Sequence, residues 1–231
     1  MIHVGTSGWQ YPPWRGRFYP PDLPAKKMLG WYAQQFDTVE INHSFYKKPT
    51  AKVLRGWAAQ VPPQFRFSLK AWQGITHHRR LRDCEGAVRQ FARAARSLKE
   101  RLAPVLYQVP PNLKADSSLL RDFLAVLPPD LRAAFEFRHA SWFTDQTWDA
   151  LRGAGAALCI AESEDLATPF VRTAGFGYFR LRRLDYDLAG LRRWAEKVRA
   201  FEEAYVYFKH EDTGLGPEFA RTFASLIDPG R

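Results

Sequence analysis

The stretch Ala133–Arg138, AAFEFR, places two charged side chains inside a run that otherwise has the composition of a buried strand. Successive residues of a β-strand point to opposite faces, so Phe135 and Phe137 share one face while Glu136 and Arg138 share the other. In a closed barrel the outward side chains pack against helices, and the inward ones can be polar. The alternation therefore fits a barrel strand that turns Glu136 and Arg138 toward the interior.

Strand-like runs of this kind recur along the whole chain, separated by segments with helical spacing of apolar residues. Eight runs are predicted as strands: Ile2–Thr6, Asp37–Asn42, Phe65–Lys70, Val105–Val109, Ala133–Arg138, Ala156–Ala161, Gly177–Leu181 and Ala204–Lys209. Apolar residues recur at helical spacing from Leu119 to Leu127 and from Leu191 to Phe201, and further helices are predicted at residues 25–35, 50–60, 85–101, 145–152 and 217–227. Eight strands that alternate with helices indicate an α/β fold, a (β/α)8 TIM barrel. No linker divides residues 1–231, so we expect a single domain.

The inward positions near the strand ends carry most of the chemistry that the sequence offers. Barrel enzymes place their sites at the carboxyl ends of the strands. We predict that the catalytic group comprises Glu40, Lys70, Glu136, Arg138 and Arg180, with Asn42, Gln108 and Lys209 as substrate contacts. Cations outnumber carboxylates in this set, which favours an anionic ligand. The alternative is that these charges pair with one another and only fill the barrel.

Aromatic residues lie beside basic ones in the loops that follow the strands. The first loop, from Trp9 to Tyr19, contains Trp14 next to Arg15. Aromatic faces beside guanidinium groups suit stacked bases flanked by phosphates. Predicted substrate contacts in these loops are Trp9, Trp14, Tyr46, His139 and Trp142. The alternative is that the first loop packs as an aromatic lid; we favour packing for Trp14 and substrate contact for Trp9.

The last loop, KHEDTGLGPEFA, suits an anion site at the start of a helix. Gly214 and Gly216 precede Pro217, and proline is favoured in the first helical turn. Barrels often bind phosphate in the loops after strands seven and eight, so Arg182 is predicted to supply charge there. Alternatively, the nearby acidic residues Glu211, Asp212 and Glu218 cap this helix.

Composition limits the class of protein. The chain has 34 Lys and Arg against 24 Asp and Glu, a formal charge of +10, which permits a polyanionic partner but also arises from solvated helix faces. No apolar run is long enough to span a membrane, and no secretory signal is visible. Two cysteines exclude a disulfide framework, so we expect a cytoplasmic protein, with a monomer favoured and the oligomeric state open.

Metal binding is the minor alternative for the strand ends. Five histidines, His43, His77, His78, His139 and His210, follow predicted strands, near carboxylates that can bind divalent ions. No ordered metal-binding spacing supports such a site, and the neighbouring Arg and Lys oppose it. We therefore predict no cofactor and no metal ligand.

Several segments together resemble the YecE-like domain-of-unknown-function family number 72 in matching order over nearly the full chain. They are VGTSGWQYPPWRGRFYP, FDTVEINHSFYKKP, FRFSLKAWQGITHHRRL, PVLYQVPPNLK, AFEFRHASWF, ALCIAES and VYFKHEDTGLGP. The resemblance implies a TIM barrel of unestablished activity. The chain departs from the family pattern in having Arg180-Leu181-Arg182-Arg183 where many members have RLHG, Phe208-Lys209-His210 where many have FNN, and Glu162 where Asp is usual.

These observations predict an enzyme that acts at the barrel mouth on a phosphate-containing substrate, with nucleic acid or a nucleotide favoured and phosphodiester hydrolysis as one reaction. In this hypothesis Glu136 is a general base or metal ligand, Glu40 is its partner, and the cations stabilise developing negative charge. Two alternatives stay open: a lyase, isomerase or hydrolase of a small anionic sugar or acid, and a non-catalytic nucleic-acid-binding module.

Overall fold

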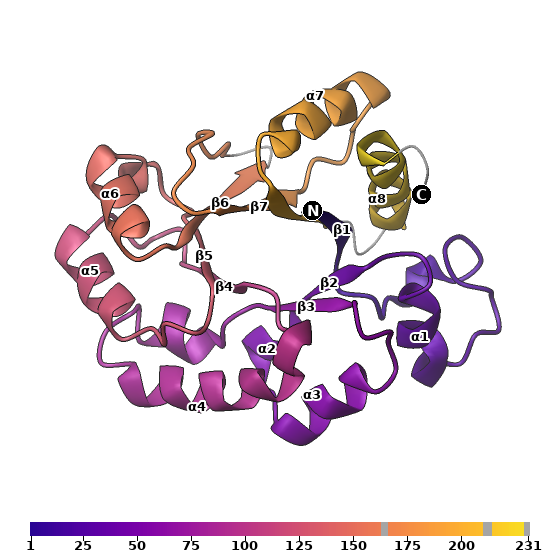
Figure 1. Ribbon diagram of the computed structural model, residues 1–231, viewed down its shortest axis with the longest axis horizontal. Coiled ribbons are helices and arrows are strands. Elements are labelled where there is room, and N and C mark those ends of the chain that lie inside the picture. The colour runs from indigo at the N-terminus through magenta and orange to yellow at the C-terminus, as the bar shows by residue number, and fades with distance from the viewer. Residues whose placement is uncertain (163–165, 210–213, 229–231) are drawn as a thin grey trace.

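Eight parallel strands form the centre of the molecule within residues 1–162, 166–209 and 214–228, which the computed structural model describes (Figure 1). The strands are β1 (Ile2–Ser7), β2 (Thr38–Ile41), β3 (Arg66–Leu69), β4 (Val105–Gln108), β5 (Ala133–Glu136), β6 (Ala157–Glu162), β7 (Phe176–Leu181) and β8 (Glu203–Phe208). Each lies within a residue or two of its predicted range. The fold prediction is therefore confirmed.

The strands close into a nearly complete barrel. Their order is β3-β2-β1-β8-β7-β6-β5-β4, so β1 pairs with β8 and joins the two ends of the chain. The remaining seam lies between β3 and β4, where isolated bridges link Phe67 to Leu102 and Lys70 to Leu106. Because all strands are parallel, their carboxyl ends open at one mouth.

Helices surround the barrel between successive strands. They are α1 (Met28–Tyr32), α2 (His43–Tyr46), α3 (Ala51–Ala58), α4 (Glu85–Ala95), α5 (Ser117–Ala125), α6 (Asp145–Gly153), α7 (Leu188–Arg199) and α8 (Leu215–Ile227). Shorter turns are 3₁₀ helices at Pro12–Trp14, Ala25–Lys27, Arg96–Arg101 and Ala140–Trp142, and a π-helical turn at Gly74–His78. Four helices, α3, α5, α6 and α7, begin after a Thr or Asp whose side-chain oxygen accepts a backbone N–H of the first turn.

One predicted helix, residues 85–101, is broken in the structure. The α-helix ends at Ala95 and continues as a 3₁₀ segment, in which Lys99 has a positive φ of 52°. A residue in that conformation cannot continue an α-helix. The chain therefore turns early and enters β4.

The barrel interior combines polar and charged side chains with apolar ones such as Leu106, Ala134 and Cys159, whereas the layer between strands and helices is mainly apolar. Inside, the Tyr178 hydroxyl lies 2.7 Å from Ser68 Oγ, and the Tyr207 hydroxyl lies 2.9 Å from Thr38 Oγ1. All four side chains are buried, so these hydroxyl pairs fill the lower barrel and satisfy one another. At the start of β3 the alternation would turn Arg66 inward, but its guanidinium lies at the surface and donates to the carbonyls of Pro63 and Gln64.

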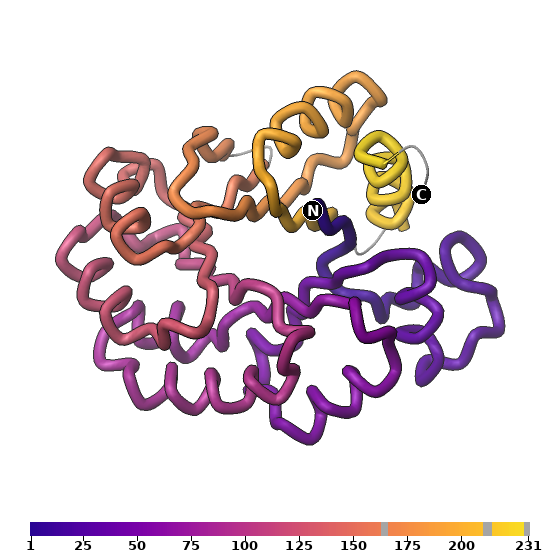
Figure 2. The backbone as a smooth tube through the Cα atoms, viewed as in Figure 1, coloured from indigo at the N-terminus to yellow at the C-terminus, as the bar shows by residue number. Residues whose placement is uncertain are grey.

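The chain winds once around the barrel, so its last helix returns to its first segment (Figure 2). Helix α8 packs beside β1. Arg17 in the first loop donates to Glu218 of α8, and Arg221 of α8 donates to Gln35 at 2.8 Å. Among the described residues no helix combines the length and apolar character that crossing a bilayer requires.

Candidate functional site

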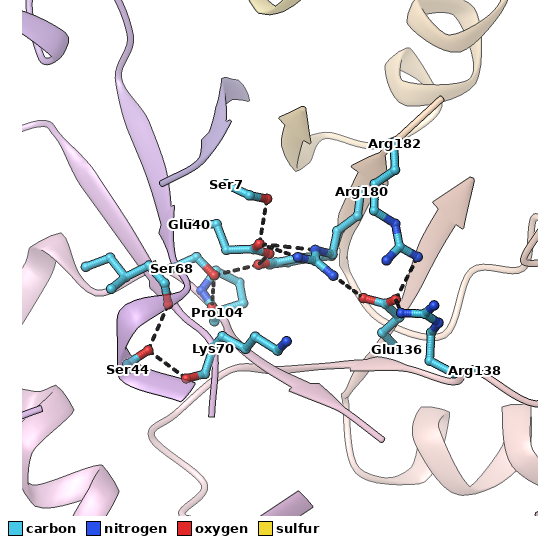
Figure 3. Close-up of polar contacts among 12 residues, drawn as sticks. Ser7, Glu40, Ser44, Ser68, Lys70, Pro104, Glu136, Arg138, Arg180 and Arg182 are labelled. Carbon is cyan, nitrogen blue, oxygen red and sulfur yellow. Dashed lines mark hydrogen bonds and ion pairs between the residues drawn. The ribbon is translucent and has the colours of Figure 1, made fainter. Parts of the chain in front are cut away.

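A buried row of charges crosses the barrel below its mouth (Figure 3). Arg180 on β7 lies at its centre and is 1% exposed. Its Nη2 donates to Glu40 Oε1 of β2 at 2.8 Å, and its Nη1 donates to Glu136 Oε2 of β5 at 2.6 Å. One guanidinium thus bridges two carboxylates from opposite sides of the barrel, a charge-assisted arrangement that fixes all three side chains.

Further donors satisfy the two carboxylates. Glu40 also accepts hydrogen bonds from Ser7 Oγ and from the Tyr178 hydroxyl, both at 2.7 Å. Glu136 Oε1 accepts from Arg182 Nη2 at 2.9 Å, and Arg138 Nη1 lies 3.7 Å from the same oxygen. Both carboxylates are fully buried, so these hydrogen-bond donors are the groups that compensate their negative charge.

Taken together, the neighbouring arginines have a stronger effect than burial on the pKa of Glu136. Burial alone would raise this pKa, but the positive charges of Arg180, Arg182 and Arg138 outweigh burial and hold the pKa of Glu136 well below its usual range. The carboxylate is therefore ionised at neutral pH and a weak proton acceptor. This environment does not suit the general base that the sequence suggested.

A cavity of about 460 Å³ opens above the charged row, at the carboxyl ends of the strands. Five cationic side chains line it: Lys70, Arg138, Arg180, Arg182 and Lys209. None of the described residues that line it carries a carboxylate, because Glu40 and Glu136 lie beneath its floor with no exposed surface. The carboxylates thus orient the arginines, while the cavity itself presents positive charge.

The aromatic wall of the cavity depends on a turn at the end of β1. Gly8 has a φ of +90°, and a Cβ there would lie 2.3 Å from the Tyr11 hydroxyl oxygen. This left-handed turn, which glycine permits, directs Trp9 into the cavity wall. There its ring packs edge-on against Trp57 of α3, with centroids 5.2 Å apart.

Lys70 follows the last residue of β3 and has an unusual setting. Its backbone oxygen accepts a hydrogen bond from Ser44 Oγ at 2.6 Å, which ties this strand end to α2. Its Nζ lies 3.9 Å from the centroid of the Phe45 ring. Burial, and then the positive charge of Arg180, lower the pKa of Lys70 to about 7, although Glu136 and Glu40 act in the opposite direction.

Most of the predicted site residues do meet at the mouth. Nine of them line the cavity: Trp9, Asn42, Tyr46, Lys70, Gln108, Arg138, Arg180, Arg182 and Lys209. The contribution of each to function stays a prediction.

Two predicted substrate contacts are instead core residues. Trp14 is 1% exposed and packs among Tyr11, Phe18 and Tyr19 in the first loop. Trp142 is fully buried, stacks on Phe137 at 4.6 Å and donates its indole N–H to the Leu113 carbonyl. Neither ring lines the cavity. The packing favoured for Trp14 from the sequence agrees with this structure, whereas the substrate contact predicted for Trp142 is wrong in it.

The remaining predicted contacts lie apart from the cavity lining. His139 Nδ1 lies 2.8 Å from Ser141 Oγ and caps the short Ala140–Trp142 turn. Gly214 caps α8 with a φ of +71°, and Gly216 is buried in the first turn of that helix. Neither glycine is in the cavity lining, and Arg182 donates to Glu136, so the phosphate site predicted from Gly214, Gly216 and Arg182 stays a prediction. His210, Glu211 and Asp212 lie outside the described residues.

The residues at the mouth offer little to a metal ion. No cluster of three or more His, Cys, Asp or Glu side chains suited to a metal occurs within residues 1–162, 166–209 and 214–228. Glu136 directs its oxygens at three arginines, and Glu162 accepts hydrogen bonds from Tyr186 and Trp194 on another side of the barrel rim.

Six cavity residues are absent from the sequence-based site prediction: Gly8, Gln10, Tyr11, Ile41, His43 and Trp57. Trp57 comes from a helix whose pattern is typical of core packing, and its position beside Trp9 depends on how α3 returns along the barrel. His43 and Tyr11 also line the cavity. Both sit in the strand-end loops already singled out, which is the signal that would have included them.

Related proteins are found among curated sequences. The UPF0759 protein YunF of Bacillus subtilis is 30% identical over 185 residues, which cover 75% of this chain and 64% of YunF. The UPF0759 protein YecE of Escherichia coli is 29% identical over 144 residues, which cover 62% of this chain and 50% of YecE. The matches thus span less than two thirds of the length of either relative.

Solved structures show the same barrel. A DUF72 family protein from Thermotoga maritima is 26% identical and superposes with a TM-score of 0.89 over 99% of both chains. A DUF72 family protein from Enterococcus faecalis is 19% identical, with a TM-score of 0.81 over 99% of this chain and 98% of that one, a likeness of fold alone. The pattern described as "Protein of unknown function DUF72" matches residues 3–230, and the chain therefore belongs to the DUF72 family, as its sequence motifs predicted.

Proposed function

We propose that the protein is an enzyme that binds a phosphate-bearing ligand, of about the size of one nucleotide, in the cavity at the barrel mouth. The observation that carries this proposal is the charge of the lining: five cationic side chains and, among the described lining residues, no carboxylate. A concave site with one sign of charge attracts ligands of the opposite sign. A cavity of about 460 Å³ falls in the range of small-molecule sites.

The side chains of this site have three roles in the proposal. Arg138, Arg182 and Lys209 line the cavity and supply positive charge for a phosphate group. Glu136 acts through the arginines as a positioning residue, because its carboxylate lies beneath them. Trp9 and Tyr46 offer aromatic surface for a base or another ring.

Phosphodiester hydrolysis with a carboxylate as general base has the least support among the reactions considered. Both buried carboxylates already accept hydrogen bonds from arginines and hydroxyl groups, so neither reaches a substrate in the cavity. The cationic lining suits instead the binding of a substrate and the stabilisation of a negatively charged intermediate.

We also propose a cytoplasmic location. Cys84 and Cys159 are both free thiols, and a reducing compartment keeps thiols in this state.

The decisive experiment compares two arginines at opposite ends of the same strand. Arg138 follows β5 and lines the cavity with 31% of its side chain exposed, whereas Arg132 precedes β5 with 40% exposed and pairs with Glu203. Calorimetric titration with adenosine 5′-monophosphate is expected to show at least tenfold weaker binding for Arg138→Gln, equivalent to about 1.4 kcal/mol. Arg132→Gln should bind like the wild type.

Two further titrations test the class of ligand. Adenosine, which lacks the phosphate, should bind at least tenfold more weakly than the monophosphate. Added salt should weaken the binding of the monophosphate but not that of adenosine. Equal affinity for both, or an unchanged affinity in Arg138→Gln, would contradict the proposal. A single-stranded oligonucleotide that binds with a steep salt dependence, while the mononucleotide does not bind, would replace it with a nucleic-acid track.

A further inference from the structure

Lys70 differs from the arginines that share its cavity. Arg180 and Arg182 donate to buried carboxylates, whereas Lys70 Nζ makes no hydrogen bond or ion pair with another described residue and lies over the Phe45 ring. The amine therefore lies at the cavity without a described carboxylate in hydrogen-bonding contact with it. It is the kind of amine that enzymes use as a nucleophile.

We propose that Lys70 captures the carbonyl group of a phosphate-bearing aldehyde or ketone as an imine, the phosphate lying against the cationic lining of the cavity. This inference rests on the proposed function and deepens it, because it names the reacting group of the ligand. The cations then hold the ligand, and Lys70 reacts with it.

The surroundings of Lys70 favour the neutral amine that this chemistry needs. Only an unprotonated amine carries the lone pair that attacks a carbonyl carbon. Burial and neighbouring cations lower the pKa of Lys70 to about 7, so a large share of the molecules carry a neutral amine at neutral pH. The charged or titratable groups that act on Lys70 are Arg180 of β7, Glu136 of β5, Glu40 of β2, Lys209 after β8 and His77 after β3, and Arg138 after β5 lines the same cavity.

His77 adds no positive charge to this environment at neutral pH. Burial first, and then the positive charge of Lys70, lower the pKa of His77 to about 4. Its Nδ1 lies 2.9 Å from Thr76 Oγ1, and its ring packs edge-on against Phe45. The amine thus has an apolar, uncharged flank on the side of Phe45 and a cationic flank on the side of Arg180.

The reaction balances without an oxidant, a reductant or a metal. The nitrogen lone pair of Lys70 attacks the carbonyl carbon, and the C=O π electrons move to oxygen, giving a carbinolamine after proton transfer from nitrogen to oxygen. The hydroxyl group then gains a proton and leaves as water while the nitrogen lone pair forms the C=N bond, and the nitrogen releases its remaining proton to solvent, so that one water molecule is formed per imine. Hydrolysis by the reverse route releases the carbonyl compound and restores the amine.

Pyridoxal 5′-phosphate is a suitable probe, because it carries an aldehyde and a phosphate on one small ring. Borohydride reduces its imine to a stable secondary amine, and peptide mass spectrometry then locates the modified lysine. Lys48 is the matched internal control: its Nζ lies 4.0 Å from the Trp72 ring, but it is exposed and donates to Gln90. We expect Lys70 to be half-modified at a probe concentration at least tenfold lower than Lys48.

Three comparisons separate a reactive site from ordinary lysine labelling. Pyridoxal, which lacks the phosphate, should modify Lys70 at least tenfold less efficiently, and inorganic phosphate should protect Lys70 but not Lys48. The modification rate of Lys70 should rise with pH around a midpoint near 7, the pKa of its amine. In Lys70→Arg, checked for folding by circular dichroism, the adduct at this peptide should disappear.

The outcomes also separate this inference from the proposed function. Modification of Lys70 no faster than Lys48 would overturn the inference, and intact binding of adenosine 5′-monophosphate would leave the anion site standing. Equal labelling by pyridoxal and its phosphate, with no protection by phosphate, would overturn the inference as stated and the phosphate site together. Because the labelling is mapped in the wild-type chain, the result holds even if Lys70→Arg does not fold.

Discussion

Glu136 is a residue whose removal tests the charged row directly. Glu136→Gln would leave Arg180, Arg182 and Arg138 without the carboxylate that they share, and breaking a buried ion pair in this way costs about 3–5 kcal/mol. The matched variant Glu203→Gln, in a partly exposed pair with Arg132, should cost about 1 kcal/mol or less. Urea unfolding at neutral pH measures both, and equal losses would show that the row is not a buried network.

The same carboxylate sets how stability responds to acid. Its folded-state pKa is lowered, so its stabilising contribution is complete above the pKa of the unfolded carboxyl, about 4.3, and is lost as pH falls toward the lower folded-state value. The stability difference between the wild type and Glu136→Gln should therefore stay constant from pH 7 down to about 4.5 and shrink only below it.

Lys70 should make stability rise with pH in the same direction as Glu136 but in a higher pH range, because its pKa is also lowered in the folded protein. The amine has a folded-state pKa of about 7, whereas an unfolded lysine titrates near 10.4, so between these values the unfolded chain binds the extra proton. The free energy of unfolding of the wild type should accordingly rise with pH from about 7 to about 10, relative to Lys70→Met. Lys48→Met serves as the control. A parallel pH profile for the wild type and Lys70→Met would mean that Lys70 is charged in the folded protein.

At the scale of elements, the first loop shows how one segment both packs and lines the cavity. Trp14 is buried among aromatic rings, so Trp14→Ala should cost about 3–5 kcal/mol of unfolding free energy. Tyr46, 69% exposed at the cavity rim, is the contrasting residue: Tyr46→Ala should change stability by less than about 0.5 kcal/mol yet weaken nucleotide binding. Thermal melts and the calorimetric titration decide, and a stable Trp14→Ala would identify the loop as a detachable lid.

The elements also show what a sequence can and cannot predict. The strands were predictable because alternation within runs such as Ala133–Arg138 reports which face is buried. The short helix α2 was not, since its four residues hold too little periodicity, and yet its Phe45 creates the setting of Lys70. Likewise, the sequence did not distinguish the neighbouring aromatic residues of the first loop. Trp9 and Trp14 are both buried, but the turn at Gly8 directs Trp9 to the cavity wall, whereas Trp14 packs within the loop.

For the whole molecule, the sequence predicted that charges meet at the mouth but not how they are shared. That Glu136 and Arg180 come together follows from barrel topology. Arg138 and Arg182 also contact Glu136, and the described cavity lining holds no carboxylate. These contacts depend on the conformations of side chains that come from strands far apart in the sequence, which the sequence pattern does not specify. The net charge of +10 is spread over the chain and by itself would not have located this cavity.

The filled interior of the barrel determines the route by which a ligand can enter and leave the cavity. Below the mouth, Arg180 and the hydroxyl pairs of Tyr178 and Tyr207 close the lumen, and these side chains are buried and mutually bonded. Nothing that enters the cavity can pass through and depart from the opposite end. A ligand therefore enters and leaves this cavity by the same mouth, and a product must leave before another ligand can take the place that it held.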